Sequence, residues 1–170
     1  IMVQCENEFG SYVHQRQDIP LAEHRSYNAK IKQQLSDAGF NVPFFTSDGS
    51  WLFEGGSTPG ALPTANGESN IKVLKDCVDQ YHGGKGPYMV AEFYSGWLAH
   101  WAEPHPRLNA GALARQTELY MQNDVSINFY MVHGGTNFAF TAGASFEELV
   151  LRIIALILAL TSSILNGLVM

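Results

Sequence analysis

Residues 88–92, YMVAE, form a short apolar run that ends in a carboxylate. Similar runs occupy residues 1–5, 41–46, 61–65 and 126–133, and each stops at polar residues or glycine. Short apolar runs of this kind predict strands that are buried on both faces. Their polar side chains are then expected to gather at the carboxyl ends of the strands, where parallel sheets carry their chemistry.

Helical patterns separate these runs. Helices are expected over residues 21–38, over 71–81 after Asn70 as N-cap, and over 108–121. The apolar face of the first is predicted to contain Tyr27, Ile31, Leu35 and Ala38. Strands that alternate with helices indicate an α/β fold with a parallel sheet. Five strands fit either an incomplete barrel or an open doubly wound sheet, and periodicity does not separate the two.

The composition is that of a globular domain. The 170 residues are 46% hydrophobic and 15% charged, with a net charge of −6. No basic run could neutralise a phosphate backbone, so no nucleic-acid partner is expected. The two cysteines, Cys5 and Cys77, are expected to be buried free thiols.

The C-terminal tail differs from the rest of the chain. The 18 residues from 153 to 170 carry no charge, and Ser145 with Glu148 forms a capping box that would start the helix containing them. A membrane segment is one interpretation, since such a helix would span about 27 Å. A buried or mistranslated terminus is the other, and the polar cluster Thr161-Ser162-Ser163 favours it over membrane association.

Carboxylates follow four of the predicted strands: Glu6 and Glu8, Asp48, Glu68, and Glu92. Glycoside hydrolysis needs two carboxyl groups that face one bond, one as proton donor and one ionised. Parallel strands can bring acids distant in sequence to the same end of a sheet. Spacing alone does not select the pair, and a salt bridge or helix cap is the alternative for any single acid.

The sequence contains no motif for phosphate binding, metal binding or serine nucleophile chemistry. The run DQYHGGKG lacks the first glycine and the final Ser or Thr of a phosphate loop. The six histidines show no metal-ligand spacing, and the chain has no G-x-S-x-G nucleophile motif. We therefore expect carboxylate chemistry with no metal and no cofactor.

Three segments together resemble glycoside hydrolase family 35, the β-galactosidases. They are MVQCENEFGSY (residues 2–12), AEFYSGWLAHW (91–101) and NFYMVHGGTNFAF (128–140), with TSDG (46–49) and PTANGE (63–68) between the first and second. They occur in the family's order and extend the resemblance over roughly residues 1–144.

The resemblance implies a role for five residues. Glu8 matches the family's general acid/base and Glu92 its nucleophile. Asn7 matches the amide that binds the sugar 2-hydroxyl, Tyr130 a tyrosine near the nucleophile, and Trp97 an aromatic side chain lining the sugar pocket. The family retains anomeric configuration, so the two carboxyl groups are expected about 5–5.5 Å apart. No metal or cofactor is required.

The resemblance also implies an incomplete (β/α)8 TIM barrel. Residues 1–144 would supply about strands 4 to 8, without the three β/α units that precede Glu8 in the family. The apolar helical tail, 145–170, would replace a Tyr- and Asp-rich loop. The chain alone is therefore expected to be inactive.

The expected activity is retaining release of terminal non-reducing β-D-galactose from oligosaccharides or glycoconjugates. The alternatives are another β-glycosidase of the same barrel clan, a non-catalytic carbohydrate-binding remnant, or a purely structural β/α domain. Family members are secreted, periplasmic or lysosomal, but this sequence does not indicate the compartment.

Overall fold

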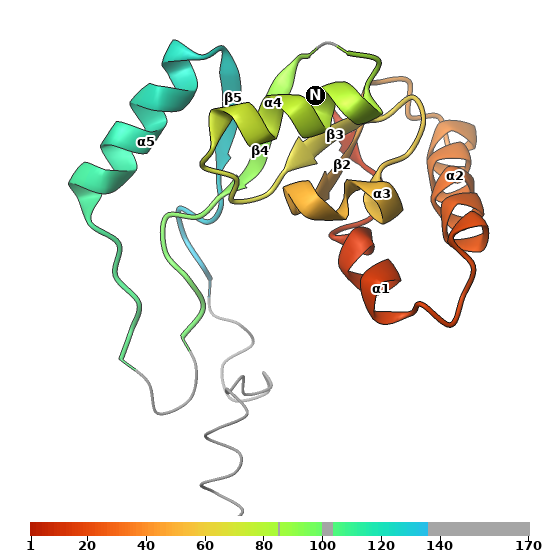
Figure 1. Cartoon of the computed structure of the whole chain (residues 1–170), viewed down its shortest axis with the longest axis horizontal. Coiled ribbons are helices and arrows are strands. Elements are labelled where there is room, and N and C mark those ends of the chain that lie inside the picture. Colours follow the sequence, from red (N-terminus) through yellow and green to blue (C-terminus); the bar gives the residue numbers. More distant parts are fainter. Residues whose placement is uncertain (85, 100–103, 136–170) are drawn as a thin grey trace, which may run out of the picture. The chain divides into compact units, whose positions relative to one another are not determined.

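A computed structural model describes residues 1–84, 86–99 and 104–135 (Figure 1). All of its helices and strands lie in one compact unit, Ile1–Ser95 with Leu108–Val132. In chain order they are β1 (Val3–Gln4), α1 (Phe9–Gln15), α2 (Leu21–Asp37), β2 (Phe44–Asp48), the 3-10 turn η1 (Ser50–Leu52), α3 (Phe53–Gly56), β3 (Leu62–Ala65), α4 (Ile71–Tyr81), β4 (Tyr88–Phe93), α5 (Ala110–Gln122) and β5 (Val125–Phe129).

Every strand pairing is parallel, as the β/α alternation predicts. Strand β2 lies between β1 and β3, and β4 pairs with β5. The backbone N–H of Gly67, just after β3, donates to the carbonyl of Glu92 in β4 at 2.9 Å. This bond joins the end of β3 to β4, so the described strands follow one another in chain order.

The core lies between the later strands and their helices. Leu74 and Val78 of α4 are fully buried and belong to one cluster with Val90 of β4. Tyr120 of α5 is 1% exposed, and its hydroxyl donates to the carbonyl of Glu68 at 2.6 Å. Each buried Leu or Val side chain contributes about 1.5–3 kcal/mol, so this cluster holds α4 and α5 against the sheet.

The expected helix limits are confirmed to within two residues. Helix α4 begins after Asn70, whose Oδ1 accepts from the N–H groups of Lys72 and Val73 at 3.0 and 3.2 Å. Helix α5 begins after Asn109, whose Oδ1 accepts from the N–H of Ala112 at 3.1 Å. The N-cap side chains therefore determine where these helices start.

Three local predictions were wrong. The segment after Glu8, expected as a loop, forms helix α1. The run predicted to be a strand over 126–133 is a strand only as far as Phe129. The buried residues of α2 are His24 and Asn28, whereas Tyr27 and Ala38 are exposed. The His24 ring and the amide nitrogen of Asn28 hydrogen-bond the backbone carbonyls of Arg16, Gly55 and Gly56, which offsets part of the cost of burying these side chains.

Cys5 is buried and Cys77 half-buried, and both are free thiols. Within the described residues no helix is both long and apolar enough to cross a bilayer. The apolar tail and its predicted capping box lie outside the described residues. The described part of the chain also contains no cluster of His, Cys, Asp and Glu side chains that could hold a metal ion.

Candidate functional site

Glu8 lies in a tight turn between β1 and α1. Both Glu6 and Glu8 adopt the left-handed backbone conformation, with φ of 60° and 48°. The N–H of Glu8 donates to the carbonyl of Ser47 near the end of β2 at 2.8 Å. Left-handed φ is costly for residues with a side chain, so surrounding contacts must hold this turn. It carries Glu8 to the carboxyl end of the sheet.

Glu92 lies within β4, one residue before its end, and is half-buried. The sequence predicts it at the end of the apolar run, and the strand continues one residue further, to Phe93. Its position inside the strand means that the sheet ladder fixes its backbone, as the bond from Gly67 to its carbonyl illustrates.

Asn66 connects the two acids. It follows β3, and its Nδ2 donates to Glu8 Oε1 at 3.0 Å. As a hydrogen-bond donor, its side chain also lowers the pKa of Glu92. Its Oδ1 accepts from the hydroxyl of Ser47 at 2.6 Å. Glu8 and Glu92, 84 residues apart in the sequence, thus meet at one amide group.

The environment of Glu92 is that of a carboxyl group in a shared site. Burial raises its pKa, and the charge of Glu8 raises it further. Hydrogen bonds from Tyr94 and Asn66 act in the opposite direction, because donors favour the ionised form. The effect of the Glu8 charge shows that the two carboxyl groups interact electrostatically.

Tyr94 is a site residue that the sequence analysis did not single out. It stands two positions after Glu92, where side chains of an extended chain share a face. Burial, then the charges of Glu92 and Glu8, raise the pKa of its hydroxyl, which hydrogen-bonds Glu92. Gly67 has φ of 61°, and a Cβ there would lie 2.6 Å from the Tyr94 ring. Because Gly67 has no side chain, the Tyr94 ring can occupy this space.

Tyr130 follows β5 and is 46% exposed. Its N–H donates to the carbonyl of Phe93 at 2.9 Å, which brings its backbone beside the end of β4. Tyr130 also contributes to raising the pKa of Tyr94. Its role near the nucleophile stays a prediction.

Asn7 is exposed, and its Oδ1 accepts from Gln4 at 2.8 Å. It lines a cavity of about 560 Å³ between α1 and α2 together with Glu6, Phe9, Tyr12 and Tyr27, whereas Glu8 is not among the lining residues. Trp97 belongs to a second unit that includes Gly96–Arg107, and its side chain is 58% exposed. The sugar-binding roles of Asn7 and Trp97 stay predictions.

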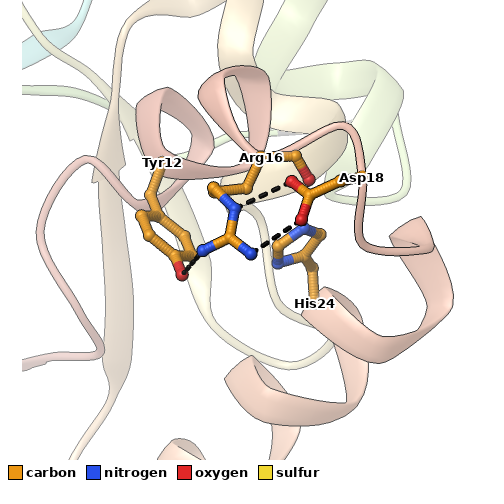
Figure 2. Close-up of polar contacts among 4 residues, drawn as sticks. All are labelled: Tyr12, Arg16, Asp18 and His24. Carbon is orange, nitrogen blue, oxygen red and sulfur yellow. Dashed lines mark hydrogen bonds and ion pairs between the residues drawn. The ribbon is translucent and has the colours of Figure 1, made fainter.

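Ile19, in the turn between α1 and α2, lines this cavity, and Figure 2 shows the polar contacts of that turn. Arg16 donates to both carboxylate oxygens of Asp18 at 2.7 and 2.8 Å, and to the hydroxyl of Tyr12 at 3.3 Å. The buried His24 ring lies against the Arg16 carbonyl at 3.2 Å. The ion pair is exposed and contributes little stability. These contacts shape the turn and offer no reactive group.

The remaining strand-end acids have structural partners. Glu68 accepts from the hydroxyl of Ser50 at 2.6 Å and from the N–H of Asn70 at 2.8 Å. Glu6 accepts from the hydroxyl of Tyr27 at 2.6 Å. Asp48 is buried, which raises its pKa to about 7, and it accepts from the N–H of Gly10. Among the described strand-end acids, Glu8 and Glu92 are the two that share a side-chain partner.

A sequence model described as "Glycosyl hydrolases family 35" matches residues 1–156. This chain belongs to glycosyl hydrolases family 35. Among family 35 relatives, it is 36% identical over 155 residues to the beta-galactosidase of Xanthomonas manihotis, covering 87% of this chain and 23% of the relative.

Two human relatives of this family 35 chain are similarly distant. Beta-galactosidase-1-like protein 2 is 34% identical over 146 residues, and beta-galactosidase is 33% identical over 148 residues. Both alignments cover 85% of this chain and 21% of the relative. The chain thus spans about a fifth of the length of these relatives.

Proposed function

We propose that this chain forms the active-site part of a retaining β-galactosidase, with Glu8 as acid/base and Glu92 as nucleophile. The observation that carries the proposal is the hydrogen bond from Asn66 to Glu8, together with the influence of both Asn66 and Glu8 on the pKa of Glu92. Two acids that interact at the carboxyl end of a parallel sheet are the arrangement that double displacement requires. The named beta-galactosidase relatives support galactosides as the substrate class.

In the first step Glu92 attacks the anomeric carbon and the bond to the leaving oxygen breaks. Glu8 donates its proton to that oxygen, so the aglycone leaves as an alcohol. In the second step Glu8 takes a proton from water, and the water oxygen displaces Glu92 from the anomeric carbon. Galactose leaves with its configuration retained, and both carboxyl groups return to their starting states.

Burial raises the pKa of Glu92 overall, and two of its neighbours act in the direction that a nucleophile needs. Tyr94 and Asn66 both donate to Glu92, and donors stabilise the ionised form that a nucleophile needs. The charge of Glu8 is one cause that raises the pKa of Glu92. When Glu8 carries the proton, this cause disappears and ionisation of Glu92 becomes easier. One proton shared by the pair is therefore a consistent starting state.

The proposal includes the fold. Residues 1–144 would supply strands 4 to 8 of a (β/α)8 barrel, and 145–170 would be a separate apolar helix. Consecutive parallel neighbours support a barrel, because a doubly wound sheet reverses its strand order at a switch point. The chain by itself would be inactive, since an open barrel leaves strand edges unpaired.

Covalent trapping tests the nucleophile. A full-length protein that contains this chain is incubated with a 2-fluoro-galactosyl fluoride, and the labelled peptide is located by mass spectrometry. We expect the label on Glu92 and no labelling of Glu92→Gln. Glu68→Gln is the matched control, since the Glu68 carboxyl group is bonded to Ser50 and to the N–H of Asn70, and it should be labelled normally. A label on another residue would refute the nucleophile assignment.

The acid/base role and the substrate class need separate measurements. Glu8→Gln should still release dinitrophenol, which leaves without protonation, but should lose activity on nitrophenyl galactosides. A panel of nitrophenyl sugars distinguishes galactosidase from glucosidase or mannosidase activity. Galactose binding without hydrolysis of any of these sugars would instead indicate a non-catalytic remnant.

A further inference from the structure

We infer that Asn66 is the positioning residue of this site: held by Ser47, its amide fixes Glu8 and Glu92 relative to each other. The inference deepens the proposed function, because it assigns a residue that organises the carboxyl pair. It rests on the hydrogen bonds of a buried Ser–Asn pair.

The Ser47–Asn66 pair is built into the sheet. Asn66 is 8% exposed and Ser47 1% exposed. The N–H of Asn66 donates to the carbonyl of Asp48 at 2.8 Å, which extends the pairing of β2 with β3 beyond Ala65. Ser47 contacts the site twice, with its hydroxyl on Asn66 and its carbonyl on the N–H of Glu8. The pairing of β2 with β3 therefore holds both Ser47 and Asn66 in place.

Ser47 also fixes which way the Asn66 amide faces. A hydroxyl can donate to the amide oxygen, and at 2.6 Å that oxygen is occupied by Ser47. Nδ2 then donates to Glu8 at 3.0 Å, and its second N–H is available to Glu92, whose pKa Asn66 lowers. The reversed orientation would place the amide oxygen against carboxylate oxygens. The network is consistent in one orientation only.

An amide suits this position because it does not titrate. During double displacement Glu92 alternates between carboxylate and ester, and Glu8 alternates between acid and carboxylate. Each form retains an oxygen that can accept a hydrogen bond. Asn66 can therefore hold both groups through the whole cycle. An aspartate here would add a third negative charge and remove both donors.

The first test uses the 170-residue chain itself and does not depend on hydrolysis. Carbon-13 labelled glutamate reports the titration of Glu92 by NMR, with Glu92→Gln used for assignment. We expect Asn66→Ala to raise the pKa of Glu92, because a donor to its ionised form is lost. Asn28→Ala removes another buried asparagine, one that donates to the carbonyls of Gly55 and Gly56, and should leave this titration unchanged.

The second test uses the full-length protein. Asn66→Ala should lower kcat about 10²-fold with little change in KM, since misplaced groups lose transition-state interactions. Ser47→Ala should lower kcat less, because the amide remains but is free to turn. Asn66→Asp should be at least as impaired as Asn66→Ala. Circular dichroism checks that each variant is folded. If Asn66→Ala does not fold, the titration of Glu92 and kcat are measured in Ser47→Ala instead.

An unchanged Glu92 titration in folded Asn66→Ala would overturn the inference, as would an equal shift in Asn28→Ala. Should Asn66→Ala fail to fold, an unchanged titration and kcat in Ser47→Ala would overturn it. Failure of the proposed function gives a different result. In that case covalent trapping fails in the wild type, while Asn66→Ala still shifts the Glu92 titration.

Discussion

Asp48 accepts a hydrogen bond from the N–H of Gly10 at 2.7 Å, which ties the end of β2 to the first turn of α1. Asp48 is only 2% exposed, and burial raises its pKa to about 7, with a further rise from the charge of Glu8. The turn that presents Glu8 is therefore anchored on a carboxyl group that folding keeps protonated below neutral pH.

Asp48→Asn should remove the part of the pH dependence of the unfolding free energy that comes from the titration of Asp48. Because the folded pKa of Asp48 is raised, its contribution is fully present below about pH 4 and is lost as pH rises through about 7. Asparagine mimics the protonated form and can still accept from Gly10. The variant should exceed the wild type in unfolding free energy at pH 8, by up to a few kcal/mol.

Urea unfolding at pH 4.5 and pH 8 measures this difference. Asp124→Asn is the matched control, because Asp124 is exposed and its left-handed φ of 56° suits asparagine. Identical pH dependence in the wild type and Asp48→Asn would show that burial does not affect this carboxyl group as argued.

Gly10→Ala should destabilise the fold. A Cβ at Gly10 would collide with the carbonyl oxygen of Leu52 and lie 2.7 Å from its Cβ. Backbone cannot move aside without displacing η1, so we expect a loss of about 1–3 kcal/mol in thermal or urea unfolding. Gly96→Ala, where nothing lies within 4 Å, should be nearly neutral. Equal stability of both variants would contradict this close packing.

Replacing Glu8 by glycine and by alanine separates backbone strain from side-chain chemistry. Both variants lose the carboxyl group, but glycine tolerates the φ of 48° and alanine does not. Glu8→Gly should be more stable than Glu8→Ala by about 1–2 kcal/mol. At Glu54, inside α3, the order should reverse, because glycine weakens helices. The same order at both positions would argue against a strained turn.

Asn70→Ala should lower the free energy of unfolding by about 1 kcal/mol. The change removes the acceptor for the N–H groups of Lys72 and Val73 at the start of α4. Asn70→Asp keeps an acceptor and adds a favourable charge at the helix N-terminus, so it should retain wild-type stability. Equal losses in both variants would show that the cap does not determine the stability of α4.

Local signals explain what the sequence could predict. Apolar runs locate β2 and β4, the Asn70 cap locates α4, and helical spacing of apolar residues locates α5, because those signals lie within or next to the elements themselves. Helix α1 was missed because its seven residues are anchored from elsewhere, by the contact of Gly10 with Asp48. The buried face of α2 was misplaced because His24 and Asn28 are polar, and only tertiary hydrogen bonds allow their burial.

The sequence likewise identified some residues of the candidate site and missed others. Glu8 and Glu92 were selected by motifs that surround each of them. Asn66 and Tyr94 lie in the same quoted segments, yet neither was chosen. The role of Asn66 depends on Ser47, from another strand, and that of Tyr94 on the space left at Gly67. Neither dependence is visible within a single motif.

Parallel pairing in chain order also bears on how the polypeptide is made. In each described ladder, a strand pairs with the strand that precedes it, as β2 does with β1 and β5 with β4. During synthesis the partner of each new strand has therefore already left the ribosome. The sheet can grow one β/α unit at a time from the N-terminal side, so β1 can pair with β2 before β4, which carries Glu92, has emerged.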